Sequence, residues 1–131
     1  MSFYDSDPRL TPLPIRLAKP LFEAFRASHH CVPEHRWHAR TTLPVLALFL
    51  AMHHEVGEDG LPWGSLDPDA LMAASLEIDH EELGFLQDLL DVSSAFYGFL
   101  GDVGAMPLAT ADRIQARLAT LSMGLCRDWA A

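Results

Sequence analysis

Residues 79–100 have the sequence DHEELGFLQDLLDVSSAFYGFL, in which apolar side chains recur at intervals of four and three residues. This spacing predicts an amphipathic helix whose apolar side chains form an a/d seam, the pattern by which helices pack together. The seam consists of Phe85, Leu89, Val92, Phe96 and Phe99. Asp79 followed by Glu82 matches a capping box, and Gly101 is typical of a helix end. We therefore expect one long helix over about 79–100.

Two further helices are predicted in the N-terminal half of the chain. Pro20 suits the first turn of a helix, and apolar residues recur around it at helical spacing: Ala18, Leu21, Phe22 and Phe25. Thr42 as an N-cap, with Pro44 in the first turn, predicts a second helix over 42–56. Apolar side chains cover every side of that second helix. This pattern predicts a helix buried all round, in the centre of a bundle or at a subunit interface.

The C-terminal part of the chain adds two predicted helices. Asp67 before Pro68 gives an N-cap followed by a first-turn proline, which predicts a short helix. Thr110 is expected to cap a last helix that stops around Gly124. Residues 57–65 are dense in turn formers and predict a loop. No segment shows the alternation of a strand, so we expect an all-α fold, a compact bundle of four to five helices.

The 131 residues are enough for one domain. Residues 1–14 hold three prolines and little periodicity, so we expect an extended arm there and a single helical domain over 15–131. The N-terminus lacks the cationic start and apolar run of a signal peptide. The longest apolar run, residues 43–52, is about half the length of a membrane span. We therefore expect a cytoplasmic protein without membrane contact.

Charge is distributed unevenly along the chain. The formal net charge is −9, and residues 41–112 contain 13 acidic residues but no Lys or Arg. A surface of this sign repels phosphate backbones and attracts cationic partners. The sequence therefore argues against direct nucleic-acid binding and favours a basic protein partner.

The apolar surface of the helices suggests what such a partner would contact. The helices over 42–56 and 79–100 are apolar around most of their circumference, which favours a second polypeptide as cover. Packing of the two helices within one monomer explains the pattern equally well. The first interpretation predicts a homodimer and a partner-binding surface formed by Phe85, Asp88, Leu89, Asp91, Val92, Phe96 and Phe99. The same interpretation predicts the function: a small non-catalytic regulator that antagonises a nucleic-acid-binding protein such as a transcription factor.

Metal binding or metal sensing is an alternative, because potential ligands gather over residues 29–38. They are His29, His30, Cys31, His35 and His38. Cys31, His35 and His38 would share one face of a continuous helix, which suits zinc. Pro33 is expected to break that helix, and no second cysteine-bearing half-site exists near it. The prediction therefore names no metal ligand and no cofactor.

Enzymatic activity at a dimer interface is a further alternative. The sequence contains neither a nucleophile elbow nor a glycine-rich phosphate loop. We therefore predict a protein that is not an enzyme, and we assign no catalytic residue.

Overall fold

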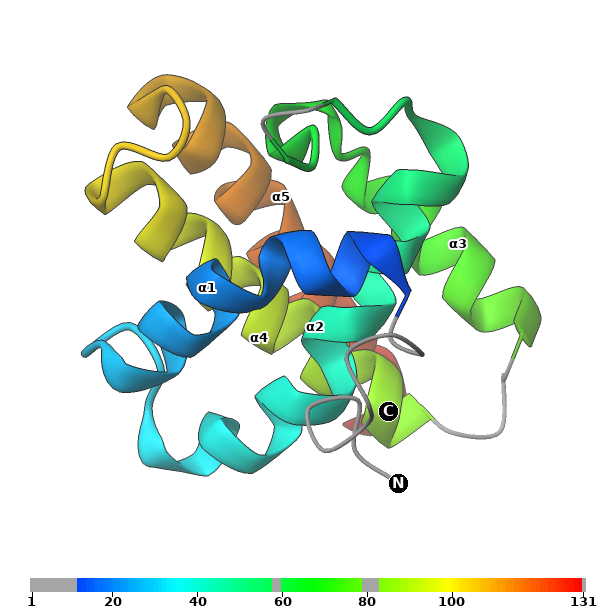
Figure 1. The fold of residues 1–131 in the computed structure, drawn as a ribbon. Helices are drawn as coiled ribbons and strands as arrows, with labels where there is room; N and C mark the ends of the chain where they lie inside the picture. The colour runs from blue at the N-terminus through cyan, green and yellow to red at the C-terminus, as the bar shows by residue number, and fades with distance from the viewer. Residues whose placement is uncertain (1–11, 58–59, 79–82, 131) are drawn as a thin grey trace.

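The computed structural model describes residues 12–57, 60–78 and 83–130 (Figure 1). These residues form five α-helices and one 3₁₀ turn. The elements are α1 (Leu13–Ala27), α2 (Pro33–His53), η2 (Trp63–Ser65), α3 (Pro68–Ile78), α4 (Leu83–Asp102) and α5 (Leu108–Ala130). The prediction of an all-α helical bundle is confirmed. Most of the predicted arm, residues 1–11, lies outside the described residues, and Leu13 and Pro14 already belong to α1.

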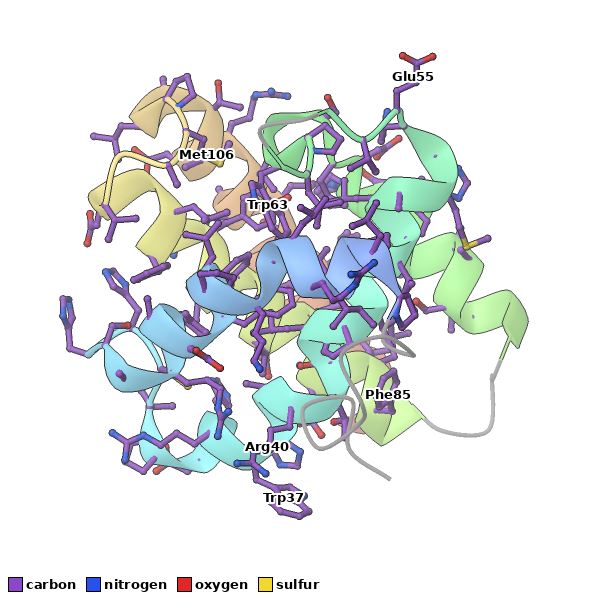
Figure 2. The ribbon with its side chains drawn as sticks, in the orientation of Figure 1. Trp37, Arg40, Glu55, Trp63, Phe85 and Met106 are labelled. Atoms are coloured by element: carbon purple, nitrogen blue, oxygen red, sulfur yellow. The ribbon has the colours of Figure 1, made fainter. Side chains whose placement is uncertain are left out.

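Helix α4 lies at the centre of the packing. It contacts α5 along much of its length and also packs against α2, which in turn contacts α1. Aromatic rings fill the junction of α1, η2 and α4. The Phe96 ring meets Phe22 and Phe25 edge to face at 5.4 Å each, and Trp63 at 5.1 Å. Such edge-to-face pairs add to the stabilisation that burial gives. Figure 2 shows Trp63 near the middle of the bundle.

Helix α1 begins earlier than predicted. It starts at Leu13 with Pro14 in the first turn, and Pro20 lies inside the helix. The predicted start near Pro20 is therefore wrong, because the chain already supplies a first-turn proline at position 14. The predicted buried stripe is largely confirmed, since Ala18, Phe22 and Phe25 are buried.

Helix α2 begins nine residues before the predicted helix over 42–56 and ends three residues before the predicted end. It starts at Pro33 and continues through Pro44 to His53. Thr42 is consequently not an N-cap, and its hydroxyl donates to the His38 carbonyl at 2.8 Å. Pro44 removes one backbone hydrogen bond from the helix. It is also buried in the core, and this burial offsets part of that cost.

Three of the remaining helix ends differ from the prediction. Asp67 caps α3 as expected, because its carboxylate accepts the backbone N–H of Asp69 at 3.1 Å. Helix α5 instead begins at Leu108, just after Pro107, so Thr110 is not its cap, and the helix continues past Gly124. Helix α4 ends at Asp102, beyond the predicted Gly101. The predicted capping box of Asp79 and Glu82 lies outside the described residues.

Among the helices in the described part of the chain, none is both long enough and apolar enough to cross a membrane.

Candidate functional site

The apolar residues predicted to bind a partner lie inside the bundle. Leu89, Val92 and Phe96 are fully buried, and Phe99 is 4% exposed. Only Phe85 is partly buried, against the edge of the core (Figure 2). The seam of α4 is therefore covered by other helices of the same chain. Its four buried side chains cannot form part of a docking surface in this fold, which corrects the expectation for them.

The two acidic residues of that prediction have partners within the chain. The Asp88 carboxylate lies 3.2 Å from Nδ1 of His38 on α2. The Asp91 carboxylate accepts a hydrogen bond from Nε2 of Gln87, at 3.3 Å, and a short one from the hydroxyl of Ser122 on α5. Both carboxylates therefore tie α4 to a neighbouring helix, and neither is an isolated surface charge.

The largest exposed apolar side chain in the described residues lies on α2. Trp37 is 73% exposed. Figure 2 shows its indole pointing away from the body of the molecule, with Arg40 beside it. Arg36, also exposed, is its neighbour in sequence. We refer to Arg36, Trp37 and Arg40 as the Trp37 surface.

Sequence reasoning missed the Trp37 surface, although a local signal was present. On a helix, the neighbours of residue 37 on its own face are residues 33, 34, 40 and 41. These positions hold Pro, Glu, Arg and Thr, none of which belongs to an apolar stripe. An aromatic residue with only such neighbours is expected to point towards solvent.

The three residues considered for a metal site in one helix do not come together. Cys31 lies before α2 and is buried, whereas His35 and His38 lie on α2. Burial raises the pKa of the Cys31 thiol, against a weaker opposite effect of Arg36 and Arg26. The thiolate that metals bind is therefore disfavoured at this position. His38 instead pairs with Asp88.

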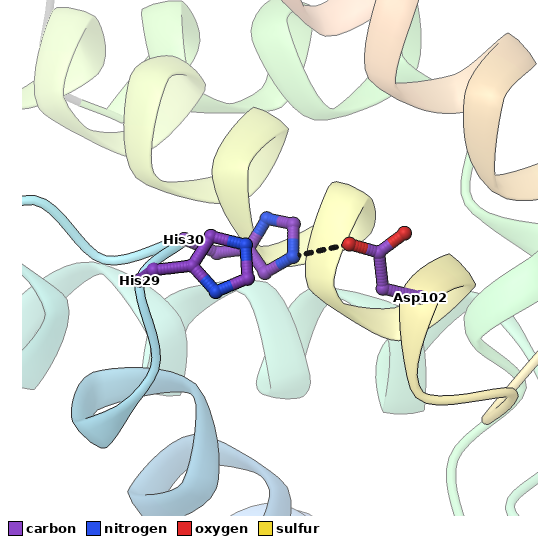
Figure 3. A group of neighbouring side chains, drawn as sticks. All are labelled: His29, His30 and Asp102. Carbon is purple, nitrogen blue, oxygen red and sulfur yellow. Dashed lines mark hydrogen bonds and ion pairs between the residues drawn. The ribbon is translucent and has the colours of Figure 1, made fainter.

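A different set of histidines from the same segment meets a carboxylate (Figure 3). His29 and His30, in the turn between α1 and α2, lie beside Asp102, the last residue of α4. One ligand atom from each residue lies within 4.8 Å of those of the other two. Nε2 of His30 is 2.6 Å from Oδ2 of Asp102. The two imidazole rings have centroids 4.3 Å apart. We refer to His29, His30 and Asp102 as the His–His–Asp cluster.

A hollow of about 340 Å³ lies between the start of α3 and α5. Its walls include Asp67, Asp69, Arg113 and Arg117. The Arg117 guanidinium donates to the Asp69 carboxylate at 2.5 and 3.0 Å, which raises the pKa of Arg117 and lowers that of Asp69. The charges of these two groups therefore compensate each other.

Comparison of the chain with known protein families, curated proteins and solved structures finds no match.

Proposed function

We propose that this chain is a small non-catalytic regulator that acts by binding another protein through the Trp37 surface. The observation that supports the proposal is the 73% exposure of the Trp37 side chain on a helix. Covering an exposed indole with a partner removes apolar surface from water, which lowers the free energy of the complex. Trp and Arg are also the residue types most enriched among the side chains that dominate binding energy at protein interfaces. The Trp37 surface combines the two.

Charge supports a partner class. The net charge of −9 attracts partners whose overall charge is positive, and salt screens this attraction beyond about 10 Å. Arg36 and Arg40 act at shorter range and favour carboxylates on the partner next to the indole. A nucleic-acid-binding protein with a basic overall charge and a local acidic patch meets both conditions. Antagonism of such a protein is the regulatory role that we propose.

Site-specific photo-crosslinking in the host cell tests this proposal. A photoreactive amino acid with an aromatic side chain, which keeps a ring in place of the indole, is placed at position 37 and, in a matched control, at position 123. Met123 is also an exposed apolar residue, 58% accessible, but it lies on α5. We expect a discrete adduct with another protein from position 37 and none from position 123. Excess wild-type chain should compete for this adduct, whereas Trp37→Ala should not.

The Trp37→Ala variant is expected to fold, because exposed substitutions usually change stability by about 0.5 kcal/mol or less. Equal crosslinking from positions 37 and 123 would contradict the proposal. An adduct formed only with a second copy of the chain would also contradict the proposal. It would show that the Trp37 surface is the interface of a homodimer.

A further inference from the structure

We infer that the His–His–Asp cluster is a binding site for a divalent transition-metal ion, with zinc as the preferred ion. The inference is independent of the proposed function, because it rests on α1, α4 and the turn after α1 rather than on the Trp37 surface. It takes His29 and His30 from the 29–38 group of potential ligands, but it differs from the site considered for Cys31, His35 and His38 and adds Asp102.

The donor atoms fit such an ion in kind and in spacing. Two imidazoles and one carboxylate are ligands that zinc uses in sites with an open fourth position. Metal–ligand distances of about 2.0–2.2 Å in a tetrahedron place the donor atoms about 3.3 Å apart. In the His–His–Asp cluster the donor atoms lie within 4.8 Å of one another, and the closest pair is 2.6 Å apart. To coordinate one ion, the His30–Asp102 pair would have to open and the other donor atoms to approach one another.

The backbone holds the two histidines side by side. On a helix, adjacent side chains point about 100° apart and do not face each other. Here Ser28 ends α1, and its hydroxyl donates to the Phe25 carbonyl at 2.7 Å and accepts the His30 N–H at 3.2 Å. The resulting turn brings the imidazoles together. The His30 ring also packs edge to face on Phe99 of α4 at 6.1 Å, which restricts its movement.

Electrostatics at the His–His–Asp cluster favour a cation. Helix α1 ends at Ala27, two residues before His29, and α4 ends at Asp102 itself. The C-terminus of a helix carries a partial negative charge from its unpaired carbonyl groups. Two such ends therefore add to the formal charge of the carboxylate. Within the described residues, no other group of three histidine, cysteine or acidic side chains brings its donor atoms as close together.

Binding of an ion here has a structural consequence. His30 and Asp102 are 72 positions apart in sequence, and the ion links the α1–α2 turn to the end of α4. An ion that binds the folded chain and not the unfolded chain stabilises the fold. A simple ion pair between His30 and Asp102 is the competing explanation of the geometry, and it requires no metal and no contribution from His29.

Metal titration of the untagged chain distinguishes the two explanations. The protein is stripped with a chelator and titrated with Zn²⁺ by calorimetry and with Co²⁺ by visible absorption, with the thermal midpoint recorded in each state. We expect one equivalent of metal and a rise in midpoint of several degrees. His29→Gln and Asp102→Asn should each weaken Zn²⁺ binding at least about tenfold.

The double variant His53→Gln/His54→Gln is the matched control, because it removes the other adjacent histidine pair of the chain. Its Zn²⁺ affinity should equal that of the wild type. His29→Gln is the most informative variant, since His29 is exposed and the ion pair does not need it. Unchanged affinity in His29→Gln, or a loss in the control of the same size, would overturn the inference. Circular dichroism of each metal-free variant verifies that it is folded.

Discussion

Tyr97 connects α4 to the loop that precedes α3. Its side chain is completely buried, and its hydroxyl donates to the Trp63 carbonyl at 2.7 Å. Burial raises the pKa of this phenol well above its ordinary value, because the phenolate would lose its hydration. The folded chain therefore keeps Tyr97 protonated at pH values at which an exposed tyrosine loses its proton.

This shift predicts how stability changes in alkali. In the unfolded chain Tyr97 releases its proton near pH 10, approximately the ordinary value. Above that pH the folded state binds one more proton than the unfolded state. The contribution of Tyr97 to the free energy of unfolding is therefore complete below about pH 10 and falls as the pH rises further. Urea denaturation at pH values between about 8 and 11 measures this fall.

Tyr97→Phe is the control for that prediction. It is expected to start about 0.5–1.5 kcal/mol less stable, because the Trp63 carbonyl loses the hydrogen bond from Tyr97 and keeps the one from the Leu66 N–H at 3.4 Å. It should then lose less stability than the wild type as the pH rises. Parallel declines in the two proteins would show that Tyr97 does not remain protonated in the fold.

Individual residues differ in how far the sequence predicts their role. Asp67 was correctly identified as a cap, because its partners lie two and three positions away. The contact between His30 and Asp102 was not, because nothing local relates residues 72 positions apart. Trp37 is partly predictable. Its exposure follows from its neighbours on the helix, but the sequence does not identify the partner that would bind it.

At the level of elements, two prolines account for the wrongly predicted starts of α1 and α2. Pro20 and Pro44 both satisfy the sequence rule for a first-turn residue, yet both lie inside longer helices. The rule uses only local chain geometry. Burial of helix faces against α4 and of Pro44 itself supplies free energy that no local rule includes.

Pro20 gives a direct test, because it is exposed and has no packing of its own to lose. Proline in a helix interior costs about 3 kcal/mol, and roughly 0.4–1 kcal/mol of this is recovered through the restricted unfolded chain. Pro20→Ala is therefore expected to raise the free energy of unfolding by about 2 kcal/mol, measured by urea denaturation.

Pro14→Ala is the matched control, since Pro14 lies in the first turn of α1, where a backbone N–H has no helical partner. It should change stability little or lower it slightly. A Pro20→Ala protein no more stable than the wild type would contradict this expectation.

For the whole molecule, the sequence left open what covers the apolar seam of α4. Periodicity identifies an apolar face but does not identify its partner. The structure places the seam against α1, α2 and α5 of the same chain, with Phe22 and Phe25 of α1 on Phe96. The predicted homodimer stays a prediction, and any interface must use other side chains, such as those of the Trp37 surface.

The dependence of unfolding on protein concentration tests this central claim most directly. Urea denaturation of the purified chain is followed over a range of about a hundredfold in protein concentration. If one copy buries the α4 seam by itself, the urea midpoint stays constant across that range. A midpoint that rises with concentration both in the wild type and in Trp37→Ala, which removes the indole of the Trp37 surface, would show that a second copy is needed to cover the seam, and would contradict the account.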